Sequence, residues 1–241
     1  MSAPHRAPAP EGFEDASRKR RLGAGLLAAA AAYVVAASMM GLVFASSPPA
    51  QLLAGLAEFE QGRALYQWGF VGASLLAPTF VSILLLLVAA AGVPTSSARR
   101  SIAGVLLGGY VAFASLAYTS QYTFLPALVD RDPAIAASWY FHDVGSIPYA
   151  IDLAGYALLG FAALLLASAL AERGRRWLAG WLAGMGALSI AAFALHAAGA
   201  GTLAGVLSLS SAALTVPIVT LAVLEGRQLR ADGDEHPPVH R

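Results

Sequence analysis

Six polar side chains interrupt long apolar stretches of this 241-residue sequence and could do chemistry there. They are Gln67, Tyr118, Gln121, Asp152, Tyr156 and His196. A carboxylate and an imidazole can act as an acid and a base, whereas Gln and Tyr side chains bind through hydrogen bonds. The set therefore predicts either a polar binding site or a small acid–base centre.

The spacing of these residues indicates that they share a site. Tyr118 and Gln121 lie three residues apart, and Tyr149, Asp152 and Tyr156 also fall on one helical face. At about 1.5 Å per residue, all six positions lie near the same end of their apolar stretches. We therefore expect Asp152, Gln121, Tyr118, Tyr156, His196 and Gln67 to line one pocket in the outer leaflet.

Asp152 has two possible roles. A charge at the centre of a membrane helix costs about 2.5–3.5 kcal/mol, and an intramembrane ionisable residue indicates a functional site. Alternatively, Asp152 forms an ion pair with Arg63 or accepts hydrogen bonds from Tyr and backbone groups. His196 could likewise be satisfied by water alone, and Gln121, Tyr118 and Tyr156 could simply join helices by interhelical hydrogen bonds.

A short motif in the middle of the chain resembles a loosely defined group of bacterial six-span membrane proteins. Its residues, in order, are Tyr118, Gln121, Pro126, Pro148, Asp152, Gly155 and Tyr156. The group has no assigned activity, so the resemblance implies only that Gln121, Asp152 and Tyr156 act together.

The composition is typical of a membrane protein. The chain is 58% hydrophobic and 12% charged, whereas soluble domains are about 25% charged. It has no cysteine, which excludes disulfides, thiolate metal ligands and cysteine nucleophiles. Fourteen Arg against one Lys, with abundant Ala, indicate a GC-rich bacterial genome.

Six apolar stretches are long enough to cross a bilayer, which needs about 20 residues. They cover 22–45, 64–92, 101–124, 147–171, 177–198 and 203–224. Because open sheet edges are not stable in lipid, the stretches predict an all-α, polytopic bundle of six transmembrane helices over residues 22–224. The polar ends, 1–21 and 225–241, are expected to be disordered tails.

The basic residues predict the orientation. Thirteen of the fifteen Lys and Arg residues fall on one side of the six spans, and only Arg63 and Arg131 fall on the other. The positive-inside rule then places both termini in the cytoplasm, in a bacterial plasma (inner) membrane. Cleavage of the first span after Ala45 as a signal peptide is an alternative, but a run of about 24 residues exceeds the usual 7–15.

Three further features follow from residue spacing. Leu52, Leu53, Leu56 and Phe59 predict a short interfacial helix in the first outer connection. Pro78 and Pro217 predict kinks, because proline cannot donate the helical hydrogen bond. Glycine pairs at spacing four predict close helix packing within the bundle or a homo-oligomer face; they are Gly104 and Gly108, Gly180 and Gly184, and Gly201 and Gly205.

Several functions are argued against by missing groups. No Lys lies in a span for a Schiff base, and the few His and Asp residues do not make a three-ligand zinc site. Neither a nucleotide-binding nor a serine-hydrolase motif occurs, and nothing supports nucleic-acid binding, so no cofactor or metal is expected. Two hypotheses remain: a non-enzymatic bundle that binds a small molecule or lipid for transport, sensing or partner association, and an enzyme using Asp152 and His196 on a lipid-like substrate.

Overall fold

The computed structural model describes residues 11–46 and 48–234, with side chains from residue 15 onward, and this part of the chain is helical without strands. The helices are α1 (Glu11–Ala45), α2 (Leu56–Ala73), α3 (Leu76–Ala90), α4 (Ala98–Val129), α5 (Pro133–Ala137), α6 (Ile147–Glu172), α7 (Arg176–Ala197), α8 (Gly201–Ala213) and α9 (Thr215–Asp234). They make six candidate membrane spans, of which α2–α3 and α8–α9 each form one. The prediction of six apolar helices is confirmed.

Helix continues beyond the predicted ends of the bundle. The first helix begins at Glu11 and the last ends at Asp234, so much of both predicted disordered tails is helical. The two ends pack together: a Cβ on Gly23 would lie 2.6 Å from the Gly226 carbonyl oxygen. Arg20 also lies 3.9 Å from Asp234. The tails at 1–10 and 235–241 lie outside the described residues.

Both predicted kinks are present as helix breaks. Proline at position i leaves the carbonyl of residue i−4 without its helical donor. Pro78 follows the break at Ser74 and Leu75 between α2 and α3, and Pro217 follows the break at Leu214 between α8 and α9. Just after the first break, the Leu75 oxygen accepts both the Thr79 hydroxyl at 2.6 Å and the Thr79 backbone N–H at 3.1 Å.

The predicted interfacial helix does not form as a separate element. Turns occupy residues 52–55, and Leu56 begins α2, which continues into the second span. Leu52 and Phe59 are buried in the bundle core rather than exposed at the membrane surface.

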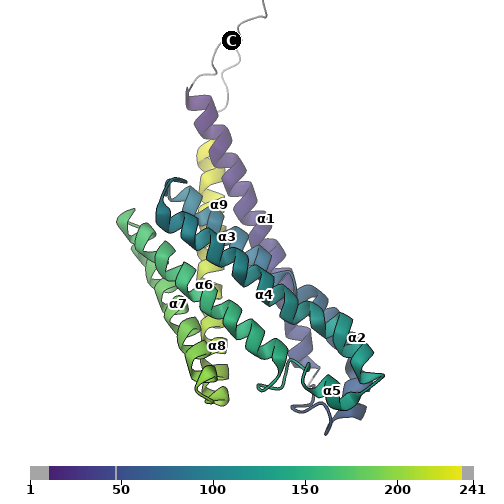
Figure 1. Ribbon diagram of the computed structural model, residues 1–241. Helices are drawn as coiled ribbons and strands as arrows, with labels where there is room; N and C mark the ends of the chain where they lie inside the picture. The colour runs from purple at the N-terminus through teal and green to yellow at the C-terminus, as the bar shows by residue number, and fades with distance from the viewer. Residues whose placement is uncertain (1–10, 47, 235–241) are drawn as a thin grey trace, which may run out of the picture.

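The spans pack in a ring in chain order. The first span, α1, contacts α2 and α3; α4 then contacts α2 and α6, and α6 contacts α7. The sixth span closes the ring in two halves, since α8 packs against α7 while α9 packs against α1 (Figure 1). The break at Leu214 therefore carries the chain from one neighbour to the other. We call the end of the bundle that holds α5 the α5 end, and the opposite one the termini end.

The glycine pairs at spacing four do not bring helix backbones together. Gly104, Gly108 and Gly180 have open space where a Cβ would stand. The nearest atoms to a Cβ on the other three glycines belong to side chains: Leu214 for Gly184, Val144 for Gly201 and Tyr149 for Gly205. Of the two alternatives, packing within the bundle therefore applies only to these last three glycines, through side chains, and not to Gly104, Gly108 and Gly180.

Candidate functional site: a central cavity at the α5 end

A cavity of about 550 Å³ lies inside the ring of helices. Its wall runs from His142 and Val144 at the α5 end to Leu159 and Met185 in the middle of the bundle. We call it the central cavity. Its volume falls within the range of about 300–1,000 Å³ that is usual for ligand sites. The polar residues on its mostly apolar wall are Tyr33, Tyr110, Tyr118, His142, Tyr149, Asp152, Tyr156, Ser208, Ser211 and Thr215.

Asp152 supplies a carboxylate to this wall. It lies less than two turns from the start of α6, where Ser146 caps the helix by accepting the Tyr149 N–H at 3.4 Å. The side chain is 6% exposed, and its Oδ2 accepts a hydrogen bond from the Tyr118 hydroxyl at 3.3 Å. Its Oδ1 has no hydrogen-bond partner. Because burying such an atom without a partner costs free energy, Oδ1 is available to a ligand.

Two other unpartnered polar atoms belong to residues of the same wall. The Tyr149 hydroxyl and His142 Nε2 are buried without hydrogen bonds. Gly205 of α8 leaves space for that hydroxyl, since a Cβ there would lie 3.2 Å from the Tyr149 oxygen. Three residues of the cavity thus have unused hydrogen-bonding capacity.

His142 is held neutral by its surroundings. The rings of Phe44 and Tyr140 lie at centroid distances of 5.5 Å from its imidazole, and Tyr66 at 5.8 Å. Burial among these rings lowers the pKa of His142 to about 4, because the apolar surroundings disfavour the charged form. At neutral pH, His142 therefore contributes no positive charge to the cavity.

The inner part of the cavity is fixed by hydrogen bonds at the break in the sixth span. The Tyr33 hydroxyl of α1 donates to Thr215 Oγ1 of α9 at 2.8 Å. On the other side, the hydroxyls of Ser189 and Ser211 lie 2.7 Å apart and join α7 to α8. These bonds hold the two halves of the sixth span against different neighbours.

Three of the six predicted site residues, Asp152, Tyr118 and Tyr156, line the central cavity. Gln121 is fully buried but lies outside the cavity wall, and its hydrogen-bonding groups are used within the protein. Its Oε1 accepts from the Tyr66 hydroxyl at 2.8 Å and from the Phe141 N–H at 3.1 Å. This arrangement anchors the 138–146 connection to the helices.

The last two predicted residues do not reach the cavity wall. Gln67 is half-buried on α2, away from the cavity lining. His196 of α7 packs against the Tyr149 ring at a centroid distance of 5.6 Å. The described side chains include no hydrogen bond between His196 and Asp152. The acid–base pair of the alternative hypothesis is therefore not joined by a hydrogen bond.

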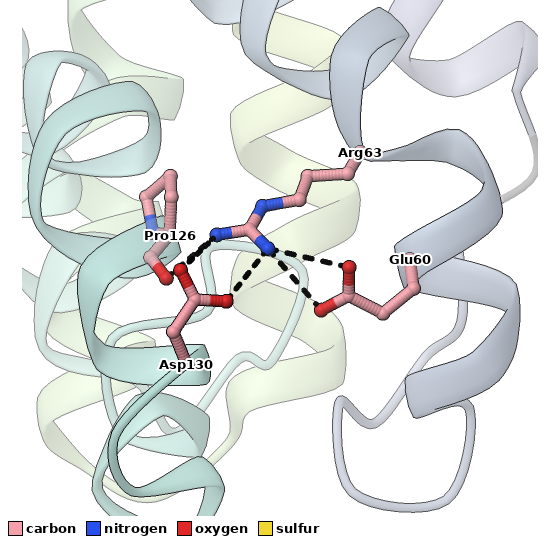
Figure 2. Close-up of polar contacts among 4 residues, drawn as sticks. All are labelled: Glu60, Arg63, Pro126 and Asp130. Carbon is pink, nitrogen blue, oxygen red and sulfur yellow. Dashed lines mark hydrogen bonds and ion pairs between the residues drawn. The ribbon is translucent and has the colours of Figure 1, made fainter.

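Of the two structural alternatives for Asp152, the hydrogen bond from a Tyr side chain is present, from Tyr118, and the ion pair with Arg63 is not formed. The Arg63 guanidinium instead binds the Asp130 carboxylate at 2.8 and 3.0 Å and the Pro126 carbonyl oxygen at 2.7 Å (Figure 2). It also lies 3.3 Å from Glu60. The hydrogen bond from Arg63 lowers the pKa of Asp130. The reason is position: Arg63 and Asp130 lie at the surface, whereas Asp152 faces the interior.

Sequence reasoning did not select several residues of the wall. Tyr110 precedes Tyr118 by eight residues, so extending the helical face of Tyr118 by two turns would have found it. Helical spacing could not have selected Tyr33 and Thr215, because they come together only through the contact of α1 with α9.

Comparisons with protein-family models, curated proteins and solved structures find no match to this chain.

Proposed function

We propose that this chain is a multi-pass membrane protein that binds an amphiphilic small molecule or lipid in the central cavity and catalyses no reaction. The observation that carries the proposal is the buried Asp152 Oδ1, which has no partner and belongs to the wall of a cavity of about 550 Å³. Mostly apolar walls with a few polar groups are typical of ligand sites.

Binding is favoured over catalysis or passage across the membrane. The acid–base pair of the catalytic hypothesis, Asp152 with His196, does not share the cavity wall, because His196 is not among the lining residues. Passage would need a path toward Arg99 or Arg173 at the termini end, and neither residue lines the cavity. The supported role is to hold a ligand for sensing or for association with a partner.

The orientation of the bundle is part of the proposal. The excess of Lys and Arg at the termini end favours a cytoplasmic location for both termini, in a bacterial plasma membrane. The central cavity then lies in the outer leaflet. A homo-oligomer through the open faces at Gly104 and Gly108 is also proposed, because nothing in the described bundle covers them.

Reporters fused to the chain test this orientation. We expect a reporter after Arg241 to be active in the cytoplasm and one inserted between Asp132 and Asp143 to be active outside, because only that arrangement retains the basic residues inside. Alkaline phosphatase and green fluorescent protein fusions measure the two locations. Cytoplasmic activity of the insertion between Asp132 and Asp143 would refute the orientation.

A photoreactive alcohol tests ligand binding directly. A twelve-carbon alcohol with a diazirine in its tail should label peptides of the cavity wall on α1, α6 and α8 when the purified protein is irradiated. Ser208→Phe should reduce this labelling at least about fivefold, because Ser208 lines the cavity and a phenyl ring would occupy it. Peptide mass spectrometry measures the labelling.

The matched control is Ser210→Phe on the same helix. Ser210 lies outside the cavity lining, where its hydroxyl bonds only to the Val206 carbonyl oxygen at 2.8 Å. Its substitution should leave the labelling unchanged. Equal labelling of both variants, or labelling confined to residues outside the cavity, would contradict the proposed function.

A further inference from the structure

The central cavity opens sideways, between α1 and α8. Among the described residues, α8 packs mainly against α7, and α1 packs against α9 beyond the break at Leu214 rather than against α8 (Figure 1). Three residues of the cavity wall lie on either side of this gap and are nevertheless exposed: Phe44 of α1 (52%), Leu209 of α8 (64%) and Val216 of α9 (66%). Because these side chains are apolar, the opening faces lipid.

The cavity wall holds a carboxyl group and has no basic residue to pair with it. Asp152 is its carboxylate, and neither Lys nor Arg occurs among its lining residues. Arg63 and Arg131, the basic residues at the α5 end, do not reach the wall, and Arg63 is bound to Asp130. The imidazole of His142 is neutral at pH 7. A cationic group on a ligand would supply the missing partner for Asp152, because a nearby cation favours the ionised form of a carboxyl group.

Aromatic rings form much of the wall. Six of them are Tyr33, Phe80, Tyr110, Tyr118, Phe141 and Tyr156. They occur in neighbouring pairs: Tyr110 with Tyr156 at 5.9 Å between centroids, and Tyr118 with Phe141 at 5.5 Å. Ring faces attract cations, and aromatic walls are a recurring feature of sites for quaternary ammonium groups.

We propose that the ligand carries an organic ammonium group, which binds Asp152 Oδ1 between the aromatic rings, and an apolar tail that leaves through the gap between α1 and α8. This inference rests on the proposed function and names its ligand class. An anionic head would find neither Lys nor Arg on this wall. A sugar or polyol would bring many hydroxyls to a wall where three residues, Asp152, Tyr149 and His142, have buried polar atoms without partners.

Three probes with the same diazirine tail and different heads test the charge preference. One carries trimethylammonium, one a hydroxyl and one a sulfate. For the purified protein, labelling of cavity peptides should be at least about tenfold stronger with trimethylammonium than with the alcohol at equal concentration, and weakest with sulfate. Asp152→Asn should reduce the ammonium signal to that of the alcohol, because the amide keeps the shape but removes the charge.

The control is Asp132→Asn, which removes a carboxylate at the same end of the bundle. Asp132 caps α5 by accepting the Ala134 and Ile135 N–H groups at 3.0 and 3.2 Å, and asparagine caps a helix equally well. This variant should label as the original protein does. If Asp152→Asn does not fold, the comparison of the three heads on the original protein still decides the question.

The outcomes separate this inference from the proposed function. Equal labelling by trimethylammonium and alcohol within the cavity would overturn the ammonium assignment while supporting the binding function. Absence of cavity labelling with every probe would overturn both. Competition identifies the source of the cation: a short-chain phosphatidylcholine that displaces the ammonium probe indicates a lipid headgroup, and displacement only by dodecyltrimethylammonium indicates a free amphiphilic amine.

Discussion

Replacing Gln121 with alanine is expected to lower the free energy of unfolding by about 3–5 kcal/mol. The substitution leaves the buried Tyr66 hydroxyl and Phe141 N–H without their acceptor, and the Trp139 carbonyl oxygen without the Gln121 Nε2 donor at 3.0 Å. Each unsatisfied buried group costs about 1–3 kcal/mol. Unfolding in mixed micelles with increasing fractions of dodecyl sulfate measures the change.

Ser120→Ala is the control for that substitution. Ser120 is buried beside Gln121 and accepts one of its N–H groups at 2.8 Å, but Gln121 Nε2 keeps the Trp139 oxygen as an acceptor. We therefore expect a loss of only about 1 kcal/mol. A loss below about 1 kcal/mol for Gln121→Ala itself would show that the 138–146 connection is not anchored through this side chain.

Gln121 also shows why polar residues in spans are ambiguous in a sequence. It shares a helical face with Tyr118, and both were predicted to bind a ligand. The structure separates them: Tyr118 lines the cavity, while Gln121 binds the returning chain at Trp139 and Phe141. A sequence shows how deep in the membrane a residue lies and which face of its helix it occupies. It does not show where the following connection folds back and forms hydrogen bonds with that residue.

The parts of the fold that could be predicted depend on local physics. Span length follows from bilayer thickness, and the breaks near Pro78 and Pro217 follow from the missing N–H. What could not be predicted depends on which helices are neighbours. The helical ends at 11–21 and 225–234 are polar, and their order is explained by packing of α1 against α9, a contact between the two ends of the chain.

The same division applies to the cavity. Asp152 could be selected from the sequence because a carboxylate within a membrane helix is unfavourable in free energy. The helical spacing then added Tyr118 and Tyr156. The sideways opening could not be predicted from the sequence. It exists because α8 packs against α7 whereas α9, after the break at Leu214, packs against α1. Tyr33 of α1 lies at the site because α1 packs against α9, where its hydroxyl donates to Thr215.

Glycines give a third case, because spacing alone selected the wrong ones for close packing. Gly180 and Gly184 stand four residues apart, whereas the glycine of α7 that contacts another backbone is Gly186, on a different face. A Cβ on Gly186 would lie 2.7 Å from the Gly160 carbonyl oxygen of α6, and a Cβ on Gly160 equally close to the Gly186 oxygen. This crossing lets α6 and α7 approach closely just beyond the inner part of the cavity.

Gly186→Val is therefore expected to destabilise the protein by about 3 kcal/mol or more, since a branched side chain would force two backbones apart. Gly108→Val on α4 is the matched control: nothing lies within 4 Å of a Cβ there, so the folded monomer should lose little stability. Unfolding in mixed micelles measures both variants, and light scattering measures their oligomeric mass. A fall in mass for Gly108→Val alone would locate a contact between copies at that face. Equal destabilisation of both monomers would refute the packing of α6 against α7 through Gly160 and Gly186.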